Sequence, residues 1–130
     1  MAKCLHFCEE YKVSYSHDCI GNWQQERINY VLRALVDKFS GEFWYSDDSL
    51  EYSDHIEIDK ETIGKIIIHL EKAGDEWGDV EFNNDNEEFL QRIVSELGKD
   101  DITPLSISEF LYDALHNGEK TIDYVHFTWL

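Results

Sequence analysis

Residues 42–88 have the sequence EFWYSDDSLEYSDHIEIDKETIGKIIIHLEKAGDEWGDVEFNNDNEE, in which two strand-like segments precede a helix-like one. Between residues 50 and 59 apolar and polar residues alternate almost strictly, and Leu50 and Tyr52 fall on the apolar side. Such alternation is typical of a half-buried strand. Residues 42–45 predict a shorter strand, and the intervening Ser-Asp-Asp-Ser sequence supplies turn residues. The stretch therefore predicts a β-hairpin with an acidic outer face.

Four segments have the i, i+3, i+4 apolar spacing of amphipathic helices, and a glycine follows each of them. Side-chain caps are expected from Asn22 with Gln25, from Asp59, and from Ser106 with Glu109. Glycine commonly ends a helix because it adopts the left-handed conformation without strain. The predicted helices begin near residues 22, 60, 86 and 106, and they are expected to end at Gly41, Gly74, Gly98 and Gly118.

The remaining segments complete a single α+β domain over residues 1–130. Residues 3–16 alternate as one strand, in which Glu9 interrupts the apolar face, and residues 120–129 predict a final strand. Residues 75–83 are expected to form a loop or a short edge strand, and Pro104 is expected to keep its surroundings out of a helix. The order β-α-β-β-α-(β)-α-α-β predicts an antiparallel or mixed sheet of about four to five strands, with about four helices packed on it. The first and last strands are expected to be neighbours in its centre.

The charge of the chain limits its partners. The formal net charge is −17, and residues 42–88, with 16 of the 28 carboxylates and three basic residues, account for −13 of it. Such a charge repels nucleic acid and anionic membranes and attracts basic proteins. No run of about 18 apolar residues predicts a membrane span, the first residues lack the apolar core of a signal peptide, and three cysteines suit no disulfide framework. We therefore expect a cytoplasmic protein with no direct nucleic-acid or membrane contact.

Cys4, Cys8, His17 and Cys19 form the one group of soft metal ligands in the sequence. Their spacing lacks the close Cys-x2-Cys pair of common zinc sites. The acidic turns lack the glycine of an EF-hand loop, and no hydrolase, zincin, dinucleotide or P-loop motif is present. We therefore expect no cofactor and no catalysis, while an enzyme or zinc protein built on this N-terminal strand remains the second alternative.

Aromatic residues among the carboxylates predict an interface more than a plain solvated face, because buried rings with a charged rim are typical of interfaces. The hairpin and the acidic segment after the second helix are the two candidate parts of this interface. Carboxylates would steer the partner's approach, and a few rings would hold the complex. The predicted partner-binding residues are Trp44, Tyr45, Asp47, Asp48, Glu51, Asp54, Glu57, Asp75, Glu76, Trp77, Asp79 and Glu81.

These features predict a small acidic inhibitor of a basic protein. The preferred hypothesis is an immunity protein that neutralises a nuclease-type toxin by covering its nucleic-acid site, with carboxylates in place of phosphates and rings in place of bases. The first alternative is a nucleic-acid mimic of phage or mobile-element origin that blocks a restriction or defence complex. Both hypotheses are analogies at the level of protein class, drawn from the distribution of charge.

Overall fold

The computed structural model describes residues 3–10, 14–82 and 87–130, and it shows an α+β fold with one five-stranded antiparallel sheet. The strand order is β2-β1-β5-β4-β3. The strands are β1 (Leu5–Glu10), β2 (Ser14–Tyr15), β3 (Phe43–Tyr45), β4 (His55–Asp59) and β5 (Tyr124–Trp129). The helices are α1 (Gln25–Lys38), α2 (Lys60–Ala73), α3 (Glu87–Lys99) and α4 (Pro104–Asn117), and two 3₁₀ turns, η1 (Leu50–Tyr52) and η2 (Trp77–Asp79), lie between them.

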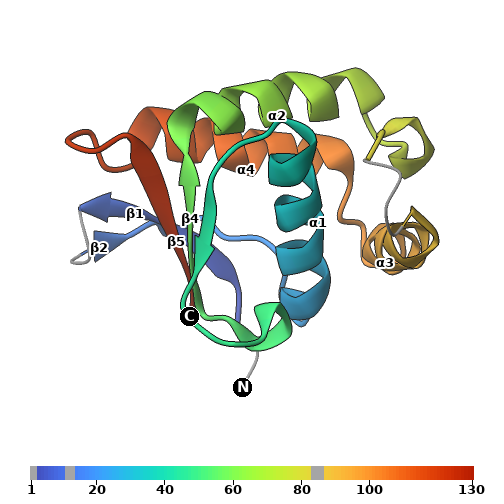
Figure 1. Ribbon diagram of the computed structural model, residues 1–130, viewed down its shortest axis with the longest axis horizontal. Coiled ribbons are helices and arrows are strands. Elements are labelled where there is room, and N and C mark those ends of the chain that lie inside the picture. Colours follow the sequence, from blue (N-terminus) through green and yellow to red (C-terminus); the bar gives the residue numbers. More distant parts are fainter. Residues whose placement is uncertain (1–2, 11–13, 83–86) are drawn as a thin grey trace.

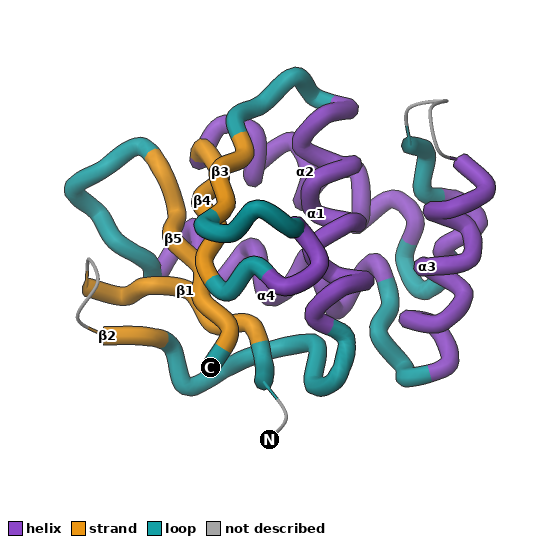
Figure 2. The backbone as a smooth tube through the Cα atoms, turned by 60° about the horizontal axis from the view of Figure 1, so that its bottom comes forward, coloured by secondary structure: helices purple, strands orange, loops and turns teal. Residues whose placement is uncertain are grey.

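The helices α1, α2 and α4 cover one face of the sheet, and α3 lies beyond α1 at the far end of the molecule (Figures 1 and 2). The core forms between the sheet and these helices, because each helix buries one apolar stripe. On α2, for example, Ile63, Ile66 and Leu70 are fully buried. None of the helices that the structure describes lies against the other face of the sheet (Figure 1).

Strand β5 is the centre of the sheet and pairs with both β1 and β4. Val125, Phe127 and Trp129 are buried and alternate with polar residues, as a period-two strand requires. Phe127 lies opposite Phe7 on one side and Ile56 on the other, so apolar residues of three strands form one continuous row. The expected neighbouring position of the first and last strands is confirmed.

Two predicted strands are shorter than their alternation suggested. Strand β1 ends at Glu10, and its pairing with β2 shifts register between Cys8 and Glu10; residues 11–13 lie outside the described part of the chain. In the hairpin, η1 replaces the first part of the predicted strand, and Tyr52 is 68% exposed instead of buried. The cause is Ser53, whose buried hydroxyl accepts the Ser46 N–H and donates to the His55 carbonyl, so the strand begins only after this turn.

The ends of α1 differ from the prediction. The helix begins at Gln25 after Gln24, without a side-chain cap, because Gly21 and Trp23 form a turn with positive φ angles of 86° and 70°. The predicted cap by Asn22 is therefore wrong. At the other end Ser40, with φ 56°, takes the left-handed position that was expected of Gly41. Gly41 is required for a different reason, since a Cβ there would lie 2.1 Å from the Thr62 hydroxyl.

The boundaries of α3 and α4 also need correction. Helix α3 continues through Gly98 to Lys99, and its expected start at Asn86 lies outside the described residues. Helix α4 begins at Pro104, two residues earlier than predicted, because proline lacks only an N–H that the first helical turn does not use. Its capping box joins Thr103 to Ser106, with each side chain accepting the other's backbone N–H, and does not involve Glu109.

Asp59 caps α2 as predicted, and Gly74 ends it with φ 62°. The Asp59 carboxylate accepts hydrogen bonds from the Thr62 N–H and hydroxyl and from the Glu42 N–H. One side chain thus joins the start of α2 to the segment that leads into β3. Burial raises the pKa of Asp59, but these hydrogen bonds outweigh it and hold the pKa below the ordinary 3.8.

We expect Asp59→Ala to lower the free energy of unfolding by about 1–2 kcal/mol at neutral pH. Because the folded-state pKa is lowered, this stabilisation is fully present above the unfolded pKa of 3.8 and is lost as pH falls through the folded-state pKa. Urea unfolding of both proteins across this range checks the prediction. A difference that stays constant with pH would show that the carboxylate charge contributes nothing.

Candidate functional site

The edge of the sheet formed by β3 carries the most exposed part of the predicted interface. Phe43, Trp44 and Tyr45 pair with Ile58, Glu57 and Ile56 of β4. Phe43 and Tyr45 pack against the core, whereas Trp44 is 54% exposed. Trp44 therefore lies beside Glu57 on the face of the sheet that has no helix. Tyr45, predicted as an anchor, is half-buried and in contact with Phe43.

The hairpin loop adds the exposed carboxylates. Asp47 and Asp48 lie between β3 and η1 and are exposed, and neither appears in an ion pair of the described residues. Tyr52, which the prediction placed inward, is exposed at the end of η1. We call the exposed and half-exposed side chains of this region the hairpin surface: Glu42, Trp44, Asp47, Asp48, Tyr52 and Glu57.

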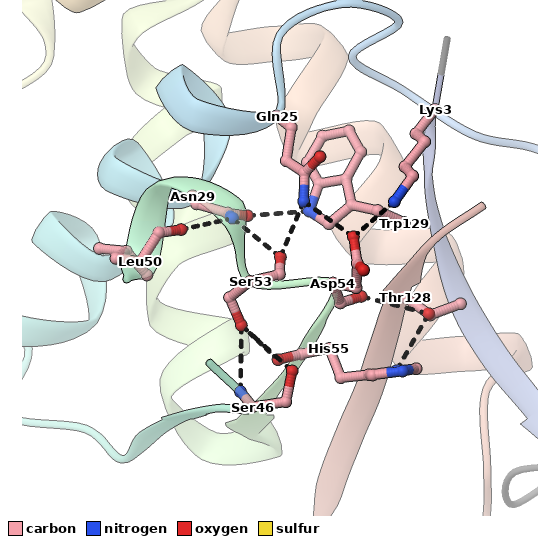
Figure 3. A network of polar contacts seen from close by, with 10 residues as sticks. All are labelled: Lys3, Gln25, Asn29, Ser46, Leu50, Ser53, Asp54, His55, Thr128 and Trp129. Carbon is pink, nitrogen blue, oxygen red and sulfur yellow. Dashed lines mark hydrogen bonds and ion pairs between the residues drawn. The ribbon is translucent and has the colours of Figure 1, made fainter. Parts of the chain in front are cut away.

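A buried polar network holds the hairpin loop in place (Figure 3). Asn29 of α1 is fully buried, and its Nδ2 donates to the Leu50 carbonyl at 2.9 Å and to the Ser53 carbonyl at 3.2 Å. Its Oδ1 accepts from Trp129 Nε1 at 2.9 Å. One amide therefore connects α1, the hairpin loop and β5. Since buried polar groups are costly without partners, this network fixes the loop conformation.

Two of the predicted steering carboxylates are part of the same framework. Asp54 accepts hydrogen bonds from Lys3 at 2.9 Å and from Gln25 at 3.2 Å. Burial raises the pKa of Asp54, but these two donors outweigh it and hold the pKa below 3.8. Glu51 accepts from the Tyr30 hydroxyl at 3.1 Å, and burial together with Glu51 raises the pKa of Tyr30. Both acids therefore position the loop.

Sequence reasoning missed a cluster around two histidines on the face of the sheet opposite the helices, where His126 and Thr128 are also buried. Glu57 Oε1 lies 3.0 Å from Nδ1 of the buried His126 on β5. The His55 ring stacks on His126 with 5.5 Å between the centroids, and Thr128 Oγ1 lies 3.0 Å from His55 Nδ1. The alternation of β5 carried the signal, because His126 and Thr128 share a parity opposite to that of the buried Phe127. Glu57 is thus engaged on one side and half-exposed beside Trp44 on the other.

The second predicted segment lies apart from the hairpin surface. Residues 77–79 contact α2 and α3 at the far end of the molecule in both views (Figures 1 and 2). Trp77 is 8% exposed, and its Nε1 donates to the Ile102 carbonyl at 2.7 Å, so this ring belongs to the core. Asp75, Glu76, Asp79 and Glu81 are exposed there, and Glu81 lies 4.0 Å from Lys38.

A polar hollow of about 620 Å³ extends the acidic region behind the hairpin. Its charged lining residues are four carboxylates and two lysines: Glu42, Asp59, Lys60, Glu61, Lys65 and Asp123. The Tyr124 hydroxyl donates to the Glu42 carboxylate, and this contact raises the pKa of Tyr124. Because carboxylates outnumber lysines in its lining, the hollow is a moderately acidic continuation of the hairpin surface.

Cys4, Cys8, His17 and Cys19 were only an alternative metal site. In the described part of the chain no group of three or more histidine, cysteine or carboxylate side chains could hold an ion. Cys8 is buried, and its Sγ contacts the Glu10 carbonyl at 2.8 Å, whereas His17 is exposed. Burial, followed by a hydrogen bond with Cys4, raises the pKa of Cys19 to about 11.

Comparisons of the chain with protein-family models, with curated proteins and with solved structures gave no match. Among the helices that the structure describes, none is both long and apolar enough to cross a membrane. The hairpin surface is therefore the feature from which a function can be inferred.

We expect Asn29→Ala to destabilise the fold by about 2 kcal/mol, because it leaves the Trp129 N–H and the Leu50 carbonyl without partners in a buried place. Gln25→Ala is the matched control. It removes hydrogen bonds to Ser53 and Asp54 from a half-exposed position and should cost less than about 1 kcal/mol. Urea unfolding measures the loss of unfolding free energy in both variants. Equal losses would contradict the claim that Asn29 is the main polar contact of the loop.

Replacing each of the two tryptophans of the predicted interface should lower the stability of the fold by different amounts. Trp77→Ala removes a buried ring and its hydrogen bond and should cost about 3–5 kcal/mol. Trp44→Ala removes a half-exposed ring at the sheet edge and should cost less than about 1 kcal/mol. Thermal and urea unfolding of the two variants measure this difference. A large loss of stability with Trp44→Ala would show that this ring belongs to the core.

Proposed function

We propose that this protein is a small acidic inhibitor that binds a basic protein through the hairpin surface. The partner that best fits this chemistry is the nuclease domain of a toxin, which the protein would neutralise as an immunity protein. Carboxylates would occupy the positions of phosphates in the nuclease cleft, and exposed rings would stack where bases bind. The action is recognition, so the proposal needs no reacting group on this chain.

One observation carries the proposal. Residues 42–59 contain seven carboxylates and no lysine or arginine, and the exposed ring of Trp44 lies among them on an edge strand. A face that served solubility alone would not require a large exposed indole. Interfaces typically place such a ring at the centre of a charged rim, where it supplies much of the binding energy.

The framework beneath the hairpin surface supports the same proposal. Asn29, Ser53 and Asp54 hold the loop by buried or half-buried hydrogen bonds (Figure 3). A loop fixed before binding loses little conformational entropy when the partner docks. Because Asp54, Glu51, Glu42 and Glu57 each have a partner within the chain, we assign the steering of the partner mainly to the exposed Asp47 and Asp48. Glu42 and Glu57 add negative charge near Trp44.

The experiment begins with the partner. Immobilised protein is used to capture binding proteins from cells of its source, and the captured protein is tested for cleavage of DNA and RNA with and without the inhibitor. The proposal expects a basic nuclease whose activity falls in stoichiometric proportion to the added protein. Capture of a restriction or defence complex would favour the nucleic-acid mimic, and capture of an acidic partner would overturn both.

With that partner, Asp47→Asn combined with Asp48→Asn should lower the association rate about threefold to tenfold at low salt, and less at high salt. Trp44→Ala should chiefly raise the dissociation rate, by about tenfold or more. The matched control is Asp100→Asn with Asp101→Asn, which removes the same charge from exposed positions after α3. Equal effects of the two double variants on the association rate would reduce the hairpin to a solvated acidic face.

A further inference from the structure

A second surface lies on α2 and α4, which run antiparallel along one side of the molecule. At one end the Leu105 N–H donates to the Gly74 carbonyl at 2.9 Å, and at the other Lys60 Nζ donates to the Glu119 carbonyl at 2.7 Å. These two contacts align the helices along their whole length. In Figure 1 the pair lies at the top, whereas the hairpin loop that follows β3 lies at the bottom. The two surfaces are therefore separate.

The centre of this helical surface is apolar although it faces solvent. Ile68 of α2 is 58% exposed and Tyr112 of α4 is 49% exposed. The alignment of the helix ends places these two residues at the same level along the pair. The Tyr112 ring stacks on His116 with 4.0 Å between the centroids, which gives the ring a defined orientation. We call these two exposed side chains, one on each helix, the apolar platform.

Gly64 makes a notch next to this platform. It lies one turn before Ile68 in the middle of α2, and a Cβ at this position would meet no atom within 4 Å. Glycine inside a helix is disfavoured relative to alanine, and no packing within the described chain requires it here. An absent side chain on an open helical face lets another chain approach the backbone closely.

Carboxylates border the apolar platform. Glu71 of α2 and Glu109, Tyr112 and Asp113 of α4 line a hollow of about 380 Å³. The cations of α2 nearest to Ile68 are Lys65, which lies 3.8 Å from Glu61, and the exposed Lys72. The three carboxylates of the hollow thus border the apolar centre on the side of α4. Such a surface is complementary to a helix that carries an apolar stripe beside a row of lysine or arginine.

We propose that the α2–α4 face, defined by Gly64, Ile68, Glu71, Glu109, Tyr112 and Asp113, binds a basic amphipathic helix of a partner protein. Apolar side chains of that helix pack on Ile68 and Tyr112, and its backbone approaches α2 at Gly64. Lysine or arginine side chains pair with the carboxylates of the rim. A second copy of this chain fits less well, because its acidic face would meet the same acidic rim on a molecule of charge −17. The inference goes beyond the inhibitor function, because it uses no residue of the hairpin surface.

The probe is a synthetic amphipathic helical peptide of leucine and lysine, added to the ¹⁵N-labelled full chain. Chemical-shift changes should concentrate on α2 and α4 around Gly64, Ile68 and Tyr112. Ile68→Ser should weaken binding about tenfold, because it removes the central apolar contact. Trp23→Ser is the matched control, since it removes a ring that is 72% exposed before α1, and it should leave the affinity unchanged.

Gly64→Gln distinguishes the effect of the notch on binding from the effect of Gly64 on the stability of α2. It should raise the melting temperature, because an open helical position gains a better helix former, and should weaken peptide binding about tenfold by filling the notch. Shift changes confined to the hairpin surface, or no saturable binding, would overturn the proposal. So would equal binding of a leucine–glutamate peptide, or a dimer in sedimentation that Ile68→Ser dissociates.

Discussion

The fully buried amide of Asn29 is the interaction on which the arrangement of the molecule depends. Its three hydrogen bonds join α1, the loop between β3 and β4, and the end of β5 (Figure 3). These elements are far apart in the chain, so one polar group sets their relative positions at the end of the core. A buried polar group that is fully satisfied adds rigidity, because every alternative arrangement leaves donors or acceptors unpaired. The loop conformation is thus part of the core and not an independent surface feature.

The carboxylates of the acidic stretch divide into two kinds with different physical roles. Asp54 and Asp59 have several donors each, and their pKa values lie below the ordinary range. Asp47 and Asp48 are exposed at the loop and contribute to the potential around the molecule. The first kind holds the hairpin and the start of α2 in place, and the second is available to a partner. Net charge alone does not distinguish them, since it counts both equally.

The sequence predicted the fold class, all four helices, the hairpin and the neighbouring position of β1 and β5, because these depend on apolar periodicity. It failed where a tertiary contact replaces a local preference. Ser53 turns the chain before β4, and the close approach of Thr62 explains Gly41 better than helix termination does. The burial of Trp77 depends on the Ile102 carbonyl, 25 residues away. Contacts at such separations leave no mark in a local pattern.

The central position of β5 also determines the order in which the fold can form. Strands β1 and β4 both use β5 as a neighbour, yet β5 is synthesised after every other strand. While the ribosome is still making α4, β1 and β4 have no shared partner, and their apolar faces lie on separate elements. The sheet therefore closes late, through pairings between residues more than a hundred positions apart, such as Leu5 with Trp129. Pairings over such distances carry a large loop-closure entropy and make folding slow. The antiparallel pair of α2 and α4 and the β3–β4 hairpin involve shorter separations, so we expect them to form before β1 and β5 pair.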